Sequence, residues 1–388
     1  MTVKVNEQKT KEQILESARR IGKAAEAESL QADLDATLSE NIIDIIREEQ
    51  INKLILPKQF GGPQIDFTTF AEMVKEVGYY NLSAAWITYF FSLHNGWVAY
   101  LPEHRQQEIV DSDGLLADIF APIGKIDKVD GGFILSGKYN YVSGINYSGW
   151  VALGAFHQPE GAESPSMHGF VVNTDDLEII ENWNSLGLRG SGSNTVIADK
   201  VFVPDDMIVD LKEMADKARP AHNNYDVDYL YYHVPFHPAF FVGFPAMSIG
   251  GAERALDEFK KSTMGRVRLD GEKEMANPRS QRVLATLTIK LTSAKSLMRT
   301  YIDMLESKEK TYHPSEFKAI RAEIIQNCVD IAVKCLLTLG ASALLKGHPI
   351  EIITRDLLAI ATHVTSLYED AIDVYGKHLF DYPVFVMG

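Results

Sequence analysis

A histidine at position 94 lies in a segment that could tune its chemistry. It occurs in AAWITYFFSLHNGWVAYLP, residues 84–102, an aromatic-rich stretch with a helical pattern that includes Trp86 and Phe90. Desolvation by aromatic neighbours lowers the pKa of an imidazole and keeps it neutral. A neutral histidine can serve as a general base or as a hydrogen-bond partner for a phenol or a peroxide. The alternative is a core histidine whose hydrogen bonds the protein itself satisfies.

Two more polar residues, His363 and Ser143, are candidates for a catalytic role. His363 lies in TRDLLAIATHVTSLYED, at the edge of the apolar face of a predicted helix, from where it could point into a pocket. Ser143 ends a strand-like run directly before Gly144, where its hydroxyl could donate to a ring nitrogen or a peroxide of a bound cofactor. The alternatives are a structural histidine and a turn serine that bonds its own backbone.

A glycine-rich stretch, SLGLRGSGSNTVIADKVFVP, covers residues 185–204. Its glycines let the backbone approach a ligand closely, and its small hydroxyl side chains and one arginine add donors. The candidate contacts for a flavin or its phosphate are Arg189, Gly190, Ser191 and Ser193. A tight turn between two strands is the alternative.

Two other segments are candidates for binding. Arg266 and Arg268 form a basic pair in an acidic chain and could hold an anion such as a flavin phosphate, although a solvated helix end is the commoner outcome. The segment NNYDVDYLYYHVPFHPAFF, residues 223–241, is rich in tyrosine and phenylalanine and includes Tyr231 and Tyr232. It is predicted to line a pocket for a flat aromatic compound, or else to be a linker packed on the core.

Several kinds of chemistry are disfavoured by missing motifs. The chain has no GxGxxG after a strand, no GxxxxGK[ST], no HExxH and no GxSxG, which argues against Rossmann, P-loop, zinc-hydrolase and serine-hydrolase mechanisms. No metal site is expected. Cys328 and Cys335, seven residues apart on an apolar helical stripe, are predicted to be core thiols.

Composition points to a soluble protein. The 388 residues are 46% hydrophobic and include 38 basic and 53 acidic side chains, a net charge of −15. A binder of nucleic acid or of anionic membranes would carry the opposite sign. No apolar run approaches the roughly 18–20 residues of a membrane span, and the N-terminus lacks the apolar core of a signal peptide. We expect a cytoplasmic protein.

The elements that must position these residues form three blocks. Helical periodicity covers about residues 8–112, short strand-like runs with glycine and asparagine turns cover 117–212, and four long helical segments cover 235–378. We therefore expect a mostly α protein with a central β-barrel domain: an N-terminal helical domain over 1–115, the β-barrel over 116–225, and a C-terminal four-helix bundle over 226–388.

This block order and five strings together resemble the acyl-CoA dehydrogenase superfamily over nearly the whole chain. The strings are AAW with LHNGW and LPEHRQQEI, SGKYNYVSGINYSGWVALGA, GLRGSGSNTVIADKVFVP, GRVRLDGEKEMANPRSQ, and RDLLAIATH. The resemblance is closer to one branch, the oxygenase components of two-component, reduced-flavin-dependent monooxygenases. Known members of that branch act on p-hydroxyphenylacetate, steroid-derived catechol precursors and dibenzothiophene.

Two departures separate this chain from the dehydrogenases of the superfamily. Those enzymes typically have a T-E-P-G-x-G-S-D-like string before the β domain, where this chain reads LADIFAPIGKID. Many also place a catalytic glutamate about eight residues beyond the Arg-Asp pair of the last long helix. Counting from Asp356 reaches Val364, which cannot abstract a proton and which is the neighbour of His363.

The resemblance implies a site and a reaction. His94, Ser143 and His363 match the catalytic residues around the reactive edge of the flavin, with Tyr141 beside the flavin and Trp86 and Phe90 beside the substrate. It implies reduced FMN or FAD (FMNH2/FADH2) from a separate NAD(P)H:flavin reductase, with O2 as co-substrate. A C4a-hydroperoxyflavin would then oxygenate an aromatic or heteroaromatic small molecule. It also implies a homotetramer built as a dimer of dimers.

Two alternatives remain open at this point. One is an FAD-containing acyl-CoA dehydrogenase or a related oxidase. The other is a non-catalytic relative that binds flavin or another ligand.

Overall fold

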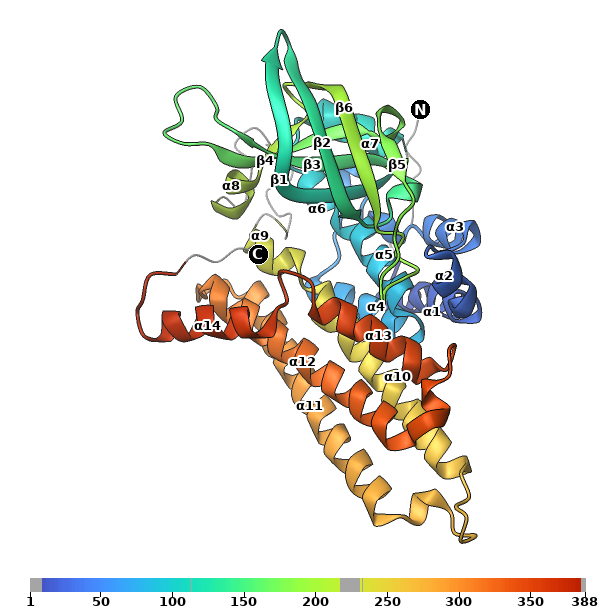
Figure 1. Ribbon diagram of the computed structural model, residues 1–388. Coiled ribbons are helices and arrows are strands. Elements are labelled where there is room, and N and C mark those ends of the chain that lie inside the picture. Colours follow the sequence, from blue (N-terminus) through green and yellow to red (C-terminus); the bar gives the residue numbers. More distant parts are fainter. Residues whose placement is uncertain (1–8, 113, 217–230, 232, 385–388) are drawn as a thin grey trace.

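The computed structural model describes residues 9–112, 114–216, 231 and 233–384 of the 388-residue chain. Three tiers are visible in Figure 1: a β-sheet at the top, a set of N-terminal helices in the middle, and a bundle of long helices below. The type of element changes where the sequence pattern changes, since the first strand begins at Leu115. The predicted boundary at residue 225 lies outside the described residues.

The N-terminal tier consists of short amphipathic helices around one central helix. Its members are α1 (Lys11–Ala27), α2 (Ser29–Asp35), α3 (Glu40–Glu48), α4 (Phe67–Tyr80), α5 (Leu82–Leu93), α6 (Asn95–Val98) and α7 (Glu103–Asp111), with 3-10 turns at Ile51–Lys53 and Lys58–Phe60. Asn81 caps α5 by accepting a hydrogen bond from the Ala84 amide, 2.8 Å away. Every residue of α5 is buried. A helix that is apolar all round belongs in a core, so α5 is the axis of this tier.

The β domain is an open sheet, and the predicted β-barrel is wrong. Its strands are β1 (Leu115–Val129), β2 (Gly132–Val142), β3 (Ser148–His157), β4 (Ser166–Asn173), β5 (Glu178–Ile180), β6 (Asn194–Pro204) and β7 (Ile208–Asp210), in the order β5-β6-β2-β1-β3-β4-β7. A barrel needs its first and last strands to pair. Within the described residues, the edge strands β5 and β7 are three residues long and each pairs on one side only, so the sheet does not close.

The C-terminal tier is a four-helix bundle, as predicted. The short helices α8 (Leu211–Asp216) and α9 (Phe236–Phe240) lead into α10 (Gly243–Gly265), α11 (Pro278–Glu306), α12 (Pro314–Leu339) and α13 (Pro349–Ala361), and α14 (Tyr368–Leu379) follows the bundle. Helix α12 packs against α10, α11 and α13, and it contains the buried thiols of Cys328 and Cys335. These cysteines are core residues, as predicted.

The prediction of one continuous helix through His363 is wrong. Helix α13 ends at Ala361, and a turn separates it from α14. In that turn the side chain of His363 bonds to Thr365, and the Ser366 amide donates to the His363 carbonyl over 2.7 Å. Polar side chains that bond to nearby groups in this way compete with the helical hydrogen-bond pattern.

The helical stretch Pro314–Leu344 is long and apolar enough to cross a membrane by length and composition, because an 18-residue window within it has a mean hydropathy of 1.5. In the fold it is chiefly α12, the helix at the centre of the bundle. Lys318 and Arg321 lie within it, and both are buried against other parts of the protein. The apolar side chains of this stretch therefore pack in the core of the bundle.

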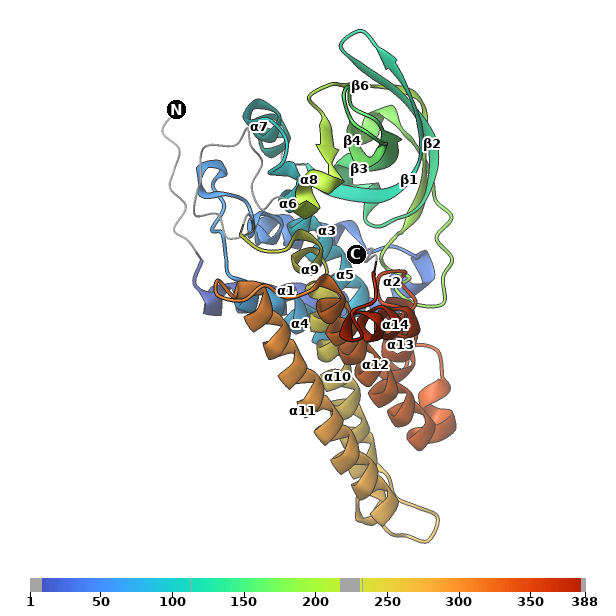
Figure 2. The same cartoon turned by 90° about the vertical axis from the view of Figure 1, so that its left-hand side faces the viewer.

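Helix α5 is the element on which the three tiers meet. It contacts β1 of the sheet and also α10 and α13 of the bundle. Figure 2 shows the same arrangement from the side, with α5 below the sheet and with α10 and α11 running away from it to a distant tip. A side chain that leaves α5 can therefore reach residues from both other tiers.

Candidate active site

Three aromatic rings on α5 and at its end form a stripe. Trp86, Phe90 and His94 are spaced four residues apart, which places them on one face of the helix. The ring centroids of Trp86 and Phe90 are 5.0 Å apart, and those of Phe90 and His94 are also 5.0 Å apart. Phe244, from the start of α10, closes on the same face at 4.7 Å from Trp86. We call Trp86, Phe90 and Phe244 the aromatic cluster.

Ser143 joins the aromatic cluster from the sheet. It follows β2 directly, and Gly144 behind it has a φ of +71°, a conformation that glycine adopts without strain. The indole nitrogen of Trp86 donates to the Ser143 hydroxyl over 3.0 Å. From Ser143 a chain of hydroxyls continues to Ser193 at 2.8 Å and then to Ser191 at 2.7 Å.

His363 reaches the aromatic cluster from the bundle. Its ring lies 5.0 Å from Phe244 and 5.8 Å from Trp86. The backbone N–H of Thr365 donates to His363 Nδ1, and the Thr365 hydroxyl lies 2.9 Å from the same nitrogen. Because Nδ1 accepts, the proton is on Nε2. Burial, and then the positive charge of Arg321, lower the pKa of His363 to about 4, so the ring is a neutral donor through Nε2.

His94 has the opposite tautomer. Its Nδ1 lies 2.6 Å from the carbonyl oxygen of Leu116, which can only accept, so the proton is on Nδ1. Burial lowers the pKa of His94 to about 4. Its other nitrogen, Nε2, is 3.2 Å from Oδ2 of Asp118 on β1. His94 therefore presents a lone pair where His363 presents an N–H group.

The fold thus brings together three residues that are far apart in sequence. His94, Ser143 and His363 come from three different tiers and border the same aromatic cluster. The ring of Phe240 stacks on the His94 imidazole at 6.2 Å, and Phe240 also lines a small cavity. The residues that line it are Leu93, Gly96, Tyr100, Tyr231, Phe236, Ala239 and Phe240. Tyr231 is thus at the cavity, and Tyr232 lies outside the described residues.

The sheet offers a surface suited to a flat ring with a polar edge. Tyr141 is 70% exposed and has a φ of +69°, at a β-bulge in the pairing of β2 with β6. An aromatic residue held in this conformation is strained, and strain of this kind concentrates at functional sites. Its ring contacts the half-buried Trp183 at 6.2 Å. The exposed ring of Tyr141, the half-buried ring of Trp183 and the hydroxyl chain that starts at Ser143 could together hold a flat ring with a polar edge.

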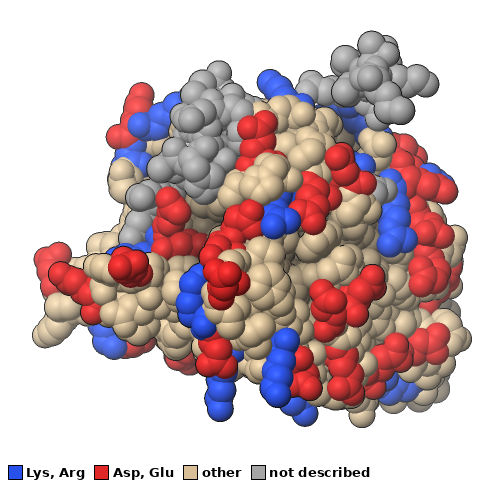
Figure 3. All heavy atoms as spheres, turned by 90° about the horizontal axis from the view of Figure 1, so that it is seen from above, with Lys and Arg blue, Asp and Glu red and all other residues tan. Residues whose placement is uncertain are grey.

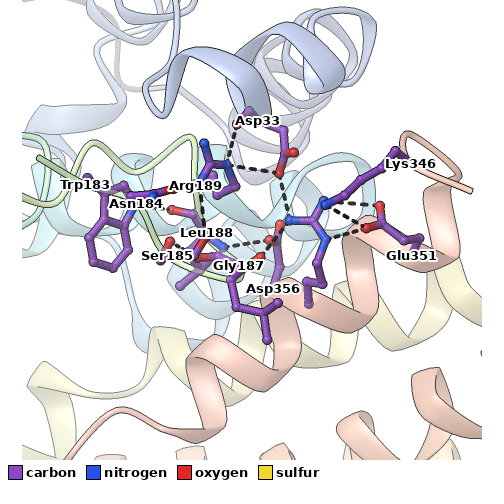
Figure 4. Close-up of polar contacts among 12 residues, drawn as sticks. Asp33, Trp183, Asn184, Ser185, Gly187, Leu188, Arg189, Lys346, Glu351 and Asp356 are labelled. Carbon is purple, nitrogen blue, oxygen red and sulfur yellow. Dashed lines mark hydrogen bonds and ion pairs between the residues drawn. The ribbon is translucent and has the colours of Figure 1, made fainter. Parts of the chain in front are cut away.

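The loop formed by residues 185–193, called the glycine loop below, is held to the helices by a buried polar network (Figure 4). Asp356 on α13 accepts from the Leu188 amide over 2.7 Å. Arg355 donates to Glu351 over 2.6 Å and to Asp33 over 2.8 Å. A Cβ at Gly187 would lie 2.1 Å from the Arg355 carbonyl oxygen, so only glycine allows this close approach.

Arg189 belongs to the same network. It donates to the Asp33 carbonyl and, over 2.8 Å, to the side-chain oxygen of Asn184. Gly190 packs against Ser83, where an added Cβ would lie 3.0 Å from the Ser83 Cβ. Within one chain, Arg189 and Gly190 therefore hold the loop to the N-terminal helices, whereas Ser191 and Ser193 continue the hydroxyl chain of Ser143.

Arg266 and Arg268 are not brought to this site within one chain. They follow α10, at the tip of the bundle in Figure 2, and both are exposed. Helix α10 ends at Gly265, 21 residues beyond Phe244, so at about 1.5 Å per residue its far end is roughly 32 Å from Phe244. Arg268 pairs locally with Asp270 at 3.3 Å.

Sequence reasoning missed three residues of the site. Phe244 begins a helix that the periodicity identified, but its partners come from other tiers. Trp183 gave no pattern. Asp118 lies in LADIFAPIGKID, the stretch that lacks the dehydrogenase string. A carboxylate within an apolar run, Leu115–Ile119, was the available signal, because buried carboxylates are rare unless they are paired.

The charge of the surface agrees with the acidic composition. On the face seen in Figure 3, acidic side chains outnumber basic ones, and the basic ones are scattered. Among the described residues no group of three or more His, Cys, Asp or Glu side chains could hold a metal ion.

Comparison with known proteins finds flavin enzymes that are similar to this chain. Residues 242–366 match the model of the acyl-CoA dehydrogenase C-terminal domain. The chain is 26% identical over 348 residues to the oxygenase component of p-hydroxyphenylacetate 3-hydroxylase from Acinetobacter baumannii, covering 87% of this chain and 82% of that protein. It is 27% identical over 351 residues to the flavin-dependent monooxygenase oxygenase subunit HsaA of Rhodococcus jostii, covering 87% and 91%.

Solved structures agree on the fold. The HsaA monooxygenase from M. tuberculosis superposes with a TM-score of 0.87 at 21% identity, covering 98% of this chain and 100% of that one. XiaF from Streptomyces sp., in complex with FADH2 and glycerol, superposes with a TM-score of 0.88 at 19% identity, covering 97% of each chain. In sequence and in fold, this chain therefore resembles the acyl-CoA dehydrogenase superfamily and, within it, the oxygenase components of two-component flavin-dependent monooxygenases.

Proposed function

We propose that this protein is the oxygenase component of a two-component flavin-dependent monooxygenase. It would take reduced FMN or FAD from a separate NAD(P)H:flavin reductase and use O2 to hydroxylate or oxygenate an aromatic small molecule. One oxygen atom would enter the substrate and the other would leave as water, with two electrons supplied by the reduced flavin. The observation that supports this most is the meeting of His94, Ser143 and His363 around one aromatic cluster.

The bound reduced flavin would supply the electrons that activate O2. Its ring would lie against Tyr141 and Trp183, with its polar edge toward Ser143. The Nε2–H group of His363 and the hydroxyl of Ser143 would then be the donors nearest to the reacting oxygen atoms. Trp86, Phe90 and Phe244 would exclude water from the same space.

His94 would act on the substrate. Its neutral ring has a lone pair on Nε2, which can take up a proton when a hydroxyl group of the substrate gives one up. Loss of that proton raises the electron density of an aromatic ring and favours its attack on an electrophilic oxygen. The small cavity lined by Tyr231 and Phe240 among others has room for about one water, so a flat apolar compound would need these aromatic side chains to move apart.

The same proposal includes a homotetrameric assembly and a location in the cytoplasm. A dimer of dimers would bring Arg266 and Arg268 of a neighbouring chain toward a flavin phosphate, which they cannot reach within one chain. The acidic surface and the relatives among oxygenase components support a cytoplasmic enzyme.

Rapid mixing tests the proposal directly. The protein, loaded anaerobically with reduced FMN or reduced FAD, is mixed with O2 and followed by absorbance. We expect a transient species that precedes the return of oxidised flavin. A protein that is yellow as purified and is reduced by an acyl-CoA without any reductase would instead establish a dehydrogenase.

A further inference from the structure

His94 and Asp118 form an isolated polar pair inside an apolar wall. Their facing atoms, His94 Nε2 and Asp118 Oδ2, are 3.2 Å apart, and their side chains are 2% and 11% exposed. Neither atom has a hydrogen bond of good geometry among the described residues, and the same holds for the indole nitrogen of the neighbouring Trp97. Buried polar atoms are normally bonded, so a cluster of three such atoms calls for a partner.

The protonation of the pair follows from its surroundings. The Leu116 carbonyl keeps the ring proton of His94 on Nδ1, so Nε2 can only accept. Burial raises the pKa of Asp118 to about 8, against a smaller opposing effect of Trp97, and burial lowers that of His94 to about 4. At neutral pH both groups are then uncharged, and the carboxyl proton of Asp118 faces the lone pair of Nε2.

A neutral pair is also the less costly arrangement. An ion pair at the same distance would need two desolvated charges, each at a cost of several kcal/mol. The charge of Asp118 also affects the pKa of Tyr89 on α5, which is itself neutral because burial raises its pKa. Neither His94 nor Asp118 has a salt bridge to a lysine or arginine in the described part of the chain.

We propose that Asp118 and His94 act as one proton-accepting unit, in which Asp118 takes the proton of a substrate hydroxyl while it passes its own proton to His94. This inference rests on the oxygenase function proposed above and identifies the hydroxyl group as the feature that the unit recognises. This role accounts for the position of the Asp118 carboxyl group, which faces the unprotonated Nε2 of His94.

The proton balance of this step closes without an outside reagent. The O–H bond of the substrate breaks, and its proton goes to the free oxygen of the Asp118 carboxyl. The original O–H bond of Asp118 breaks, and that proton goes to Nε2 of His94. The products are a substrate oxyanion, a neutral Asp118 and an imidazolium at His94, whose positive charge lies beside the new negative charge.

Binding of para-nitrophenol to the flavin-free protein tests this inference, because its ionisation is visible in its absorbance. In the wild type we expect a larger ionised fraction for the bound probe than for the free probe at the same pH. Asp118→Asn keeps the shape but cannot relay a proton, and it is expected to lower the ionisation constant of the bound probe by about tenfold. Equal ionisation in wild type and Asp118→Asn would overturn the proposal, as would failure of the wild type to bind the probe.

The chain offers a matched control. His168 and Asp210 form another His–Asp pair, 3.6 Å apart, on β4 and β7. Strand β7 is three strands away from β1 in the sheet. Asp210→Asn should leave the ionisation of the bound probe unchanged, and an effect as large as that of Asp118→Asn would count against a specific role.

A second measurement covers the case in which Asp118→Asn does not fold. Infrared absorption reports the carbonyl stretch of a protonated carboxyl group directly. Asp356 is also buried, and its pKa is raised to about 7, so Asp356→Asn removes its contribution. A remaining band that disappears near pH 8 supports the proposal, and the absence of any such band at neutral pH overturns it. Neither measurement uses flavin, so the oxygenase function can fail or stand independently.

Discussion

His94 and His363 are neutral for the same reason, but one presents a hydrogen-bond acceptor and the other a donor. Burial lowers the pKa of both to about 4, which excludes a charged imidazolium in the resting protein. Their tautomers differ because the Leu116 carbonyl accepts from one ring and the Thr365 amide donates to the other. At the scale of single residues, the backbone partner of each ring therefore decides whether it gives or takes a hydrogen bond.

Loss of the His363 donor should destabilise the oxygen-activated state of the flavin. We expect His363→Ala to shorten the life of the transient species after rapid mixing by roughly 10- to 100-fold, since a single well-placed donor has an effect of this order. More hydrogen peroxide and less oxygenated product should result. His104→Ala, at an exposed histidine on α7, is the control and should behave like the wild type. An unchanged decay in His363→Ala would remove His363 from this role.

The proton on Asp118 should also make the free energy of unfolding depend on pH. The folded protein holds this proton up to about pH 8, whereas an unfolded chain releases it near the ordinary pKa of 3.8. Unfolding therefore releases a proton, and the free energy of unfolding falls as pH rises. Asp356 contributes in the same direction only up to about pH 7.

Between pH 7 and pH 8, urea titrations should thus show a loss of about 1 kcal/mol that depends on Asp118. Asp118→Asn should lack this loss, and Asp210→Asn should retain it. Equal slopes in all three proteins would mean that Asp118 is ionised in the folded state.

At the scale of elements, helices and their stripes could be predicted, and the sheet could be predicted only in part. The stripe of α12 and the Trp86 to His94 segment follow from helical periodicity. The alternation of apolar and polar residues does not predict strand β1, because Pro122 and Gly124 interrupt it. The strand also changes its partner from β3 to β2 along its length. The pairing of His94 with Asp118 depends on that strand, so no local pattern could reveal it.

The β-bulge at Tyr141 is an element under strain. Tyr141→Gly removes a positive φ from a non-glycine residue, and its exposed ring contributes little packing. We expect the free energy of unfolding to stay equal or rise by up to about 1 kcal/mol, while flavin binding weakens. Lys200, an exposed residue with a φ of +55° on β6, is the matched control. Lys200→Gly should affect stability similarly and leave flavin binding intact, and equal flavin affinities in both variants would contradict a role for Tyr141.

Arg355 shares with Asp356 the attachment of the glycine loop to α13. Arg355 is 7% exposed and connects Glu351, Asp33 and the Leu186 carbonyl. Arg355→Ala removes the shortest ion pairs of Glu351 and Asp33 and leaves them with Lys346 at 3.5 Å and Arg189 at 3.8 Å, so we expect a loss of about 1.5–3 kcal/mol in the free energy of unfolding. Arg47→Ala breaks an exposed pair with Asp44 and should cost below about 1 kcal/mol. Similar urea midpoints for the two variants would contradict this assignment.

At the scale of the whole molecule, the site within one chain is built at one end of a long bundle whose other end is exposed. Met264, Val267 and Leu269 at the tip are between 51% and 111% exposed, next to Arg266 and Arg268. Apolar side chains clustered with a basic pair are typical of a surface that another molecule covers. One chain brings His94, Ser143 and His363 together. It does not bring Arg266 and Arg268 of its own tip near a flavin phosphate at that site.

Assembly should therefore complete the flavin site. We expect Leu269→Asp to lower the mass of the oligomer in sedimentation experiments and to weaken flavin binding with it, because a buried charge opposes the contact. Arg268→Ala should weaken flavin binding by about tenfold without changing the mass, since it removes one charged contact to a phosphate. Lys261→Ala, which removes an exposed charge from α10, should change neither quantity. Full flavin affinity in a Leu269→Asp monomer would mean that each chain holds its cofactor alone, and the tip would then need another explanation.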